Sequence, residues 1–155
     1  MSLRLLQRDR EAQDDDVAID DAGYKPRVPD GEYQAVMLGH NTAYIFRTAK
    51  VFLRFQIIDT GPHFGVELFK AYRVAKLRSK PGPNGQISLR PNNELFVDIV
   101  RLLHIRQRPD RVSLHDLKNR GWKIKTRTVT TDYKQRPLPE WLHYSVVDRI
   151  IEAGV

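Results

Sequence analysis

The feature that most constrains the fold is the stretch 50–59, KVFLRFQIID, whose side chains alternate between two different faces. One face is entirely apolar, as in a strand packed on a hydrophobic core; it consists of Val51, Leu53, Phe55 and Ile57. The other face carries an aromatic ring, a cation and an amide, from Phe52, Arg54 and Gln56. Turn-forming residues at 60–65 lead into a second strand-like stretch at 66–74. The sequence therefore predicts a hairpin around which the domain is built.

A first strand is predicted before this hairpin, over residues 33–38. A Pro-Asp-Gly turn at 29–31 precedes it, so folding is expected to begin near residue 28. The small and polar residues 39–42 are expected to end this strand. Residues 43–49 are left open between a continuation of the strand and a loop that carries Tyr44, Phe46 and Arg47.

One helix is predicted from Glu94 to Arg106, because apolar residues recur there at helical spacing on one face. A short helical turn follows at 114–119. A fourth strand is predicted over 122–131 and a fifth over 141–151. The fifth has an alternative, in which the strand passes into a short helix at Ser145.

Three strands, a helix and two further strands form the element order of the OB-fold, a five-stranded Greek-key barrel. The predicted fold class is therefore mainly β with one or two helices, the main helix lying between strands three and four. Closing the sheet into a barrel would also remove the exposed strand edges of an open sheet. Other α+β sheets share this element order, and they remain an alternative to the OB-fold-like domain predicted for 28–155.

The charge of the chain is distributed unevenly. Residues 9–21 hold seven acidic side chains and one arginine, whereas residues 28–155 hold 21 Lys and Arg against 12 Asp and Glu. We expect residues 1–27 to form a disordered acidic tail, because they contain too few apolar residues to offset the entropy of ordering. A basic body indicates a surface that binds polyanions, or simply a solvated basic domain with a solubilising tail.

Several short patterns resemble single-stranded DNA-binding proteins of the OB type from phages, plasmids and integrative elements. They are Pro29-x-Gly31-x-Tyr33, Lys50-Val51-x-Leu53-x-Phe55-x-Ile57, Gly65-x-x-Leu68 and Leu117-x-x-x-Gly121-x-Lys123. The resemblance covers about residues 29–147. It implies sequence-tolerant binding of single-stranded DNA in the replication or recombination of a mobile element, together with proteins of those processes. The acidic run of this chain is N-terminal, so the partner-recruiting C-terminal tail of bacterial relatives is not carried over.

Such proteins hold the phosphate chain with cations and stack the bases on aromatic rings. The candidate residues on strand two and on the basic loop 76–85 are Phe52, Arg54, Lys76, Arg78 and Lys80. Strand three offers Phe69 and Arg73, or Lys70 and Tyr72 if its register is shifted by one residue. Strand four adds Lys123, Lys125 and Arg127. The competing interpretation places the aromatic residues in the core and treats the strand-four cations as a solvated face.

No enzyme and no cofactor is predicted. The chain has no Cys, its five His show no metal-binding spacing, and Asp59, Glu67 and Asp98 do not form an acidic cluster in sequence. No apolar run approaches the roughly 20 residues of a membrane span, and no secretory signal is seen, so a cytoplasmic protein is expected. Small barrels often associate through exposed strands, so a homo-oligomer is expected. The sequence does not separate DNA from RNA, and the alternative function is a basic OB-like protein-interaction module without nucleic-acid binding.

Overall fold

A computed structural model describes residues 25–154 of the chain. The acidic tail predicted for residues 1–27 therefore lies mostly outside the described residues. Its last three residues, 25–27, were wrongly included, because the chain from Lys25 onward packs along the strand that contains Ser145. The Ser145 amide donates to the Pro26 carbonyl at 2.9 Å. The amide of Val28, a residue only 2% exposed, donates to Ser145 Oγ at 2.8 Å.

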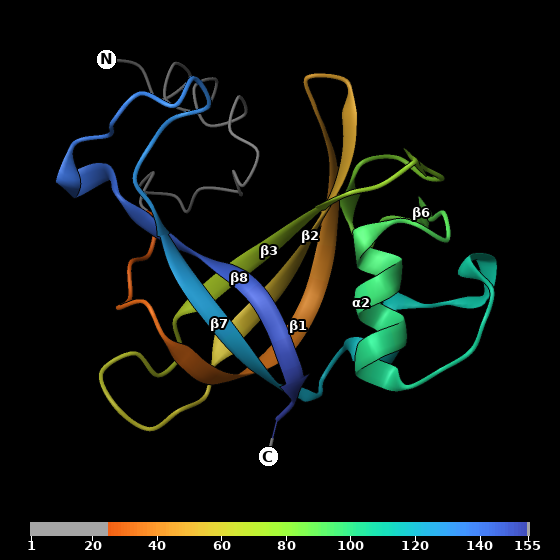
Figure 1. The fold of residues 1–155 in the computed structure, drawn as a ribbon, viewed down its shortest axis with the longest axis horizontal. Coiled ribbons are helices and arrows are strands. Elements are labelled where there is room, and N and C mark those ends of the chain that lie inside the picture. The colour runs from red at the N-terminus through yellow and green to blue at the C-terminus, as the bar shows by residue number, and fades with distance from the viewer. Residues whose placement is uncertain (1–24, 155) are drawn as a thin grey trace.

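Five long antiparallel strands form the body of the molecule (Figure 1). They are β1 (Glu32–Ile45), β2 (Thr48–Ile57), β3 (Glu67–Arg73), β7 (Gly121–Val129) and β8 (Tyr144–Ala153). Their order in the sheet is β3-β2-β1-β7-β8, and the two end strands also contact each other, which brings the sheet round toward a barrel. This arrangement confirms the predicted fold class, a mainly β domain of OB type.

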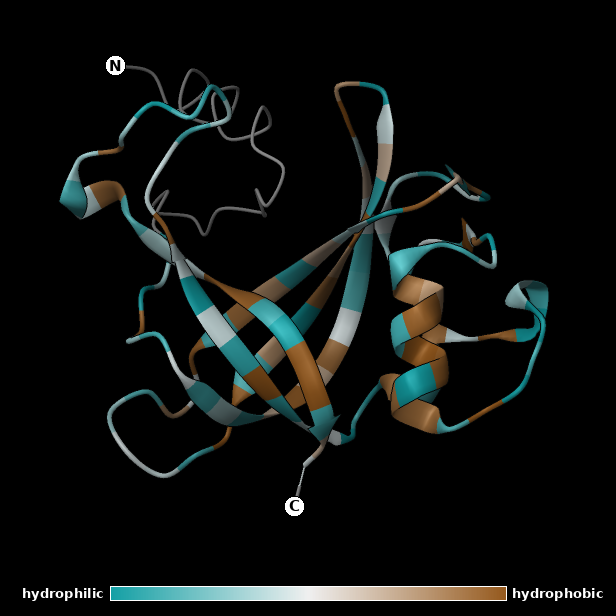
Figure 2. Ribbon diagram, viewed as in Figure 1, coloured by the Kyte–Doolittle hydropathy of each residue, from teal (hydrophilic) through white to brown (hydrophobic). Residues whose placement is uncertain are grey.

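The predicted two-faced strand forms the centre of the core. Val51, Leu53, Phe55 and Ile57 of β2 are each at most 1% exposed. Figure 2 shows polar and apolar residues alternating along β7, whereas along β8 they follow each other in pairs. On β7 the buried residues are Trp122, Ile124, Thr126 and Val129.

The predicted end of the first strand at 39–42 is wrong, since β1 continues without interruption to Ile45. A bulge at Leu38 precedes these residues instead, where the pairing with β2 shifts between Met37 and Gly39. Such a bulge bends a strand without ending it. Two partners hold the second half of β1, namely β2 and the short strand β5 (Gly82–Pro83), so tertiary pairing overrides the weak local propensity.

The helix α2 (Glu94–Leu103) lies between β3 and β7, as predicted. Asn93 caps its first turn by accepting from the Leu95 amide at 2.9 Å, and Leu95, Ile99 and Leu102 are buried. The helix ends three residues earlier than expected, because His104 adopts a left-handed conformation with φ 54°. Within residues 25–154, no helix is long and apolar enough to cross a membrane.

Short elements complete the chain. The two-stranded ladder of β4 (Lys76–Leu77) and β6 (Ile87–Ser88) follows β3, and the 3-10 helices η1 (Pro109–Arg111) and η2 (Leu114–Leu117) follow α2. A third 3-10 helix, η3 (Glu140–Leu142), precedes β8. The last strand therefore begins later than predicted, and the alternative helix at Ser145 is wrong, because Ser145 is paired with Thr128 within the β7–β8 ladder.

Candidate nucleic-acid interface

The pairing of β2 with β3 decides which predicted residues face outward. Arg54 is opposite Phe69, Phe52 is opposite Ala71 and Lys50 is opposite Arg73, all on the side away from the core. The alternative register of strand three is therefore wrong.

Tyr72 shows why that alternative fails. Its ring is 2% exposed, and its hydroxyl donates to Asp98 Oδ2 at 2.7 Å. Burial, followed by the nearby charge of Asp98, raises the pKa of Tyr72 well above its usual value, so the hydroxyl remains a donor. Lys70 shares this inward orientation, and its ammonium lies 4.8 Å from the centroid of the Tyr72 ring.

Phe52 is also unsuitable as a stacking platform. It belongs to the outer face of β2, yet only 6% of the residue is exposed. The alternation of residues in the sequence predicts which face of the sheet a side chain lies on, but it does not predict whether other residues cover that face. Of the two aromatic residues predicted for this face, Phe69 is the one that remains partly exposed.

Arg54 lies on the same outer face, above the bulge of β1. Gly39 of β1 is paired with Arg54 at this point. The Nε atom is buried, has no hydrogen-bond partner and lies 3.7 Å from Glu67 Oε1. The unsatisfied donor of Arg54 is therefore out of reach of a ligand, and a carboxylate lies beside the guanidinium.

A basic hollow of about 680 Å³ lies where β2 and β3 approach the first turn of α2. We use this name for the site formed by Lys50, Lys70, Arg73 and Arg90, which all line it. Glu94, 3.9 Å from Lys70, is an acidic residue in the same lining. The structure thus brings two predicted residues, Lys70 and Arg73, together with two cations that the sequence analysis did not select.

The predicted flexible loop 76–85 has regular structure. Lys76 is opposite Ser88 in the β4–β6 ladder, and the Arg78 amide donates to the Gln86 carbonyl at 2.8 Å. The side chains of Lys76, Arg78 and Lys80 are exposed. Arg78 lines a separate cavity beside α2, so this loop does not act as one unit with the basic hollow.

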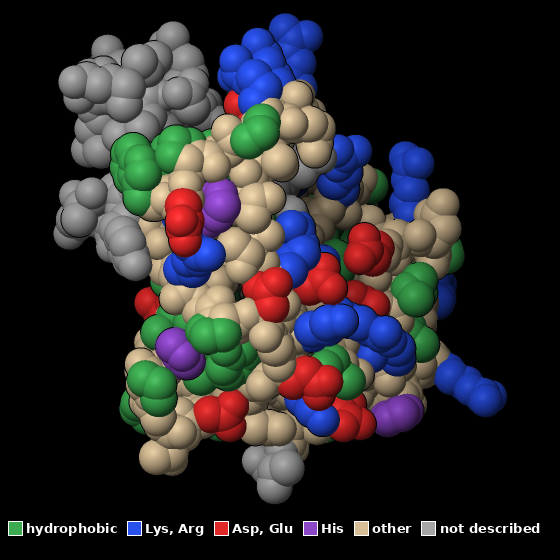
Figure 3. Space-filling view, turned by 60° about the vertical axis from the view of Figure 1, so that its left-hand side comes forward, with side chains coloured by type: hydrophobic (Ala, Val, Ile, Leu, Met, Phe, Trp, Pro, Cys, Tyr) green, Lys and Arg blue, Asp and Glu red, His purple; other side chains and the backbone are tan. Residues whose placement is uncertain are grey.

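The cations of β7 belong to a charged surface of mixed sign. Lys123 lies 3.1 Å from Glu32, and Arg127 lies 3.2 Å from Asp148. Lys125 is exposed and is opposite Arg149 of β8. Figure 3 shows acidic and basic side chains interleaved over this side of the molecule. These contacts favour the solvated-face interpretation of the predicted strand-four stripe.

The turn between β1 and β2 is a feature that the sequence analysis left undecided. Phe46 and Arg47 are its two central residues, with φ 49° and 65°. Two positive φ angles are typical of a type I′ turn, which favours Asn-Gly and strains bulky side chains. Phe46 is nevertheless 70% exposed. A strained turn that presents an aromatic ring to solvent points to a functional role.

The loop between β7 and β8 meets this turn. The rings of Phe46 and Tyr133 lie 6.2 Å apart, and Lys134 Nζ lies 5.5 Å from the Tyr133 ring centroid. We call Phe46, Arg47, Tyr133 and Lys134 the loop cluster. The same loop carries Trp141, which is 80% exposed.

Asp132 fixes the shape of this loop. Its Oδ1 accepts from the amides of Lys134 and Arg136 at 2.9 Å, and its Oδ2 accepts from Arg136 Nε at 2.8 Å. Burial alone would raise the pKa of the carboxyl, but the hydrogen bonds and the charge of Arg136 lower it overall. The ionised form therefore holds Tyr133 and Lys134 in position.

The loop cluster lies next to the basic hollow. Lys50 is three residues beyond Arg47 along β2, which corresponds to about 10 Å in an extended strand. In an OB-fold, nucleic acid binds at the outer face of strands two and three and at the loops after strands one and four. The loop cluster occupies those two loops, and the exposed Phe-Arg pair in a hairpin turn was the sequence signal for it.

Within residues 25–154, no group of three or more His, Asp or Glu side chains is arranged to hold a metal ion. Comparison with known proteins gave no matching family model, no matching curated protein and no matching solved structure.

Proposed function

We propose that this protein binds single-stranded DNA without strong sequence preference, at the loop cluster and the basic hollow. The observation that carries the proposal is the exposed Phe46 ring, held in a strained turn against Tyr133 and next to the basic hollow, where Arg73 and Arg90 are exposed. Neither a glycine-rich turn nor an isolated surface aromatic would provide this combination.

The mechanism follows from the chemistry of an unpaired strand. Its bases expose flat faces, and each stacking contact with an aromatic side chain contributes roughly 1–3 kcal/mol. Phe46, Tyr133 and Trp141 are the rings available for this, and the exposed cations Arg73 and Arg90 meet the phosphates. Rings and cations contact features that all nucleotides share, so the binding is sequence-tolerant.

The wider setting of the proposal comes from the resemblance to OB-type single-stranded DNA-binding proteins. We place the protein in the cytoplasm, as a non-enzymatic homo-oligomer that acts with replication or recombination proteins of a mobile element.

Fluorescence anisotropy with a labelled dT oligomer tests the proposal. Binding should weaken steeply with salt, with log K against log[salt] falling by roughly 0.7 for each phosphate contacted. A matched rU oligomer in the same assay separates DNA from RNA. Circular dichroism on the same samples verifies the fold, and a folded protein with a slope near zero would contradict the proposal.

The second candidate function is docking on another protein. The observation favouring it is the exposure of Trp141 and Phe46, since aromatic side chains are enriched at the centres of protein interfaces. Absence of dT binding at low salt by a folded protein would favour this candidate over the first.

A further inference from the structure

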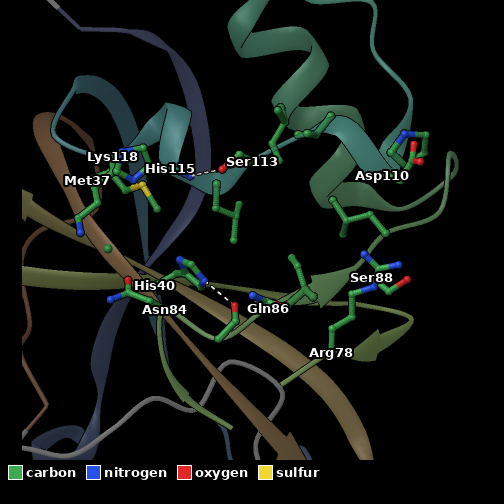
Figure 4. A pocket seen from close by; sticks show the side chains of 18 residues that line it. Met37, His40, Arg78, Asn84, Gln86, Ser88, Asp110, Ser113, His115 and Lys118 are labelled. Atoms are coloured by element: carbon green, nitrogen blue, oxygen red, sulfur yellow. Dashed lines mark hydrogen bonds between the residues drawn. The ribbon is translucent and has the colours of Figure 1, made fainter. Parts of the chain in front are cut away.

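A second concave site lies between β1 and α2. This cavity of about 500 Å³ is enclosed by β1, the chain at 84–89, α2 and the stretch 109–118 (Figure 4). We call it the helix-side cavity. Its volume falls within the range of small-molecule sites in proteins.

The cavity has a preformed wall. Gly85 is buried, and a side-chain carbon there would collide with Thr42 of β1. The close approach is also held by the Asn84 amide, which donates to the His40 carbonyl at 2.8 Å. The chain at 84–89 is thus fixed against β1, and the space behind it does not depend on a ligand for its shape.

The lining combines an apolar floor with a polar rim. Met37, Ile99 and Leu114 are buried residues of the floor. Arg78 contributes a cation on the same side of the cavity as His40 and Gln86 (Figure 4). Asp110 also reaches the rim, but its carboxylate lies 3.3 Å from the Arg108 guanidinium, which offsets its charge. The rim therefore favours an anionic group, and the floor favours a flat apolar one.

His40 adds a specific hydrogen-bond acceptor. Its Nε2 donates to the Gly85 carbonyl at 2.8 Å, which fixes the tautomer of the neutral ring. Burial lowers the pKa of His40, and the positive charge of Lys118 lowers it further, whereas the hydrogen bond to Gly85 raises it. The pKa is lowered overall, so the ring is neutral at pH 7. No described residue hydrogen-bonds its other nitrogen, Nδ1, which is left to accept from a ligand.

We infer that the helix-side cavity binds a nucleoside monophosphate, with the base stacked on the apolar floor beside His40 and the phosphate at Arg78. A fatty acid would match the floor and the cation but would bring no donor for Nδ1. A sugar phosphate would bring donors but no apolar ring for the floor. All common nucleobases carry N–H donors on a flat ring, so the nucleotide satisfies all three features.

Two sources share this chemistry: a free nucleotide and the phosphorylated end of a strand. The second rests on the proposed function, whereas the first does not. The two are separated by comparing 5′-phosphorylated and 5′-hydroxyl dT oligomers, each with and without competing mononucleotide. If the 5′-phosphorylated oligomer binds more tightly than the 5′-hydroxyl oligomer, and the mononucleotide abolishes this difference, the cavity binds strand ends. If the two oligomers bind equally, the cavity binds free nucleotide.

The test is NMR titration of the isotope-labelled full chain with AMP, CMP, GMP and UMP, and with inorganic phosphate as a control. We expect shifts at Gly85 and Gln86 with a dissociation constant of about 1 mM or tighter for at least one nucleotide. Phosphate alone should bind at least tenfold more weakly. Absence of shifts with all four nucleotides, or shifts confined to the loop cluster, would overturn the inference.

Two variants probe the two ends of the ligand. Arg78→Glu, at an exposed position, should weaken nucleotide binding about tenfold or more, because it replaces a charged hydrogen bond by repulsion. His40→Phe should weaken it through loss of the acceptor, and its amide spectrum reports whether it folds. Unchanged affinity in Arg78→Glu refutes the assignment even if His40→Phe is unfolded.

Phe46→Ala should leave nucleotide binding to the helix-side cavity intact. This control distinguishes failure of the DNA interface from failure of the cavity.

Discussion

The strand β2 runs between two turns, and each turn exposes one phenylalanine. Phe46 precedes the strand and is 70% exposed, and Phe64 follows it and is 65% exposed. The Phe46 turn has non-glycine residues at both positive φ angles, whereas in the Phe64 turn Gly61 and Gly65 take the positive φ angles. Phe46 also contacts the Tyr133 ring, from a loop that carries cations. Exposure alone therefore does not distinguish a binding ring from an incidental one, but strain, a partner ring and adjacent cations do.

The largest expected effect comes from the cations near the Phe46 turn. Arg73→Glu combined with Arg90→Glu should weaken dT binding by at least about a hundredfold, because each of the two charged contacts contributes roughly 1.5–3 kcal/mol. The matched control is Lys125→Glu combined with Arg149→Glu, an exposed pair of β7 and β8 with the same change in net charge. Anisotropy at fixed salt compares the two, and equal losses would show that only net charge matters.

The two phenylalanines provide the next comparison. Phe46→Ala should weaken dT binding about tenfold, the loss expected from one stacking contact of roughly 1–3 kcal/mol. Phe64→Ala removes a ring of nearly the same exposure and should change binding less than twofold. The difference is measured by anisotropy with a short oligomer. An equal effect of both substitutions would remove the distinction between the turns.

Strain and function are separated by replacing the Phe46 turn itself. Phe46→Asn combined with Arg47→Gly suits a type I′ turn and should stabilise the fold by about 1–2 kcal/mol, the cost of left-handed backbone in ordinary residues. The melting temperature should rise by roughly 3 °C or more. The same variant should bind dT more weakly than Phe46→Ala. A lower melting temperature would show that the turn is not strained.

The smallest expected effect is the pH dependence of stability that comes from His40, a residue that lies outside both turns. Its folded pKa lies below the ordinary 6.5, so the unfolded chain binds more protons as the pH falls. The stability that His40 contributes above pH 6.5 should be lost as the pH drops through that lower folded pKa. Lys118 and the Gly85 carbonyl act on the ring from the surrounding segments. Urea unfolding measured from pH 8 to pH 5 should show that the free energy of unfolding depends less on pH in His40→Asn than in the unsubstituted protein.

The sequence predicted those parts of the fold that depend on periodicity. Alternation of period two identified the buried face of β2, and helical spacing identified the buried face of α2. It did not predict the course of β1 beyond Gly39, because that segment is held by pairing with β2 and β5 rather than by its own propensity.

The candidate site was harder to predict than the fold. Tyr72 and Phe52 were selected as exposed rings, but both are buried. The burial of Tyr72 follows from the strand register, and the burial of Phe52 follows from the side chains that cover it. The contact between Phe46 and Tyr133 joins two loops far apart in the chain, and no local pattern reports such a contact. Arg90 of the basic hollow was missed for the same reason, since only the fold brings it beside Arg73.

Photo-cross-linking tests the location of the interface most directly. An oligomer carrying 5-iododeoxyuridine is irradiated with the full chain, and the attached peptides are identified by mass spectrometry. The account predicts cross-links at Phe46, Tyr133 or Trp141, and their loss in excess unlabelled dT. Cross-links confined to Phe64 or to the β7 surface would contradict it.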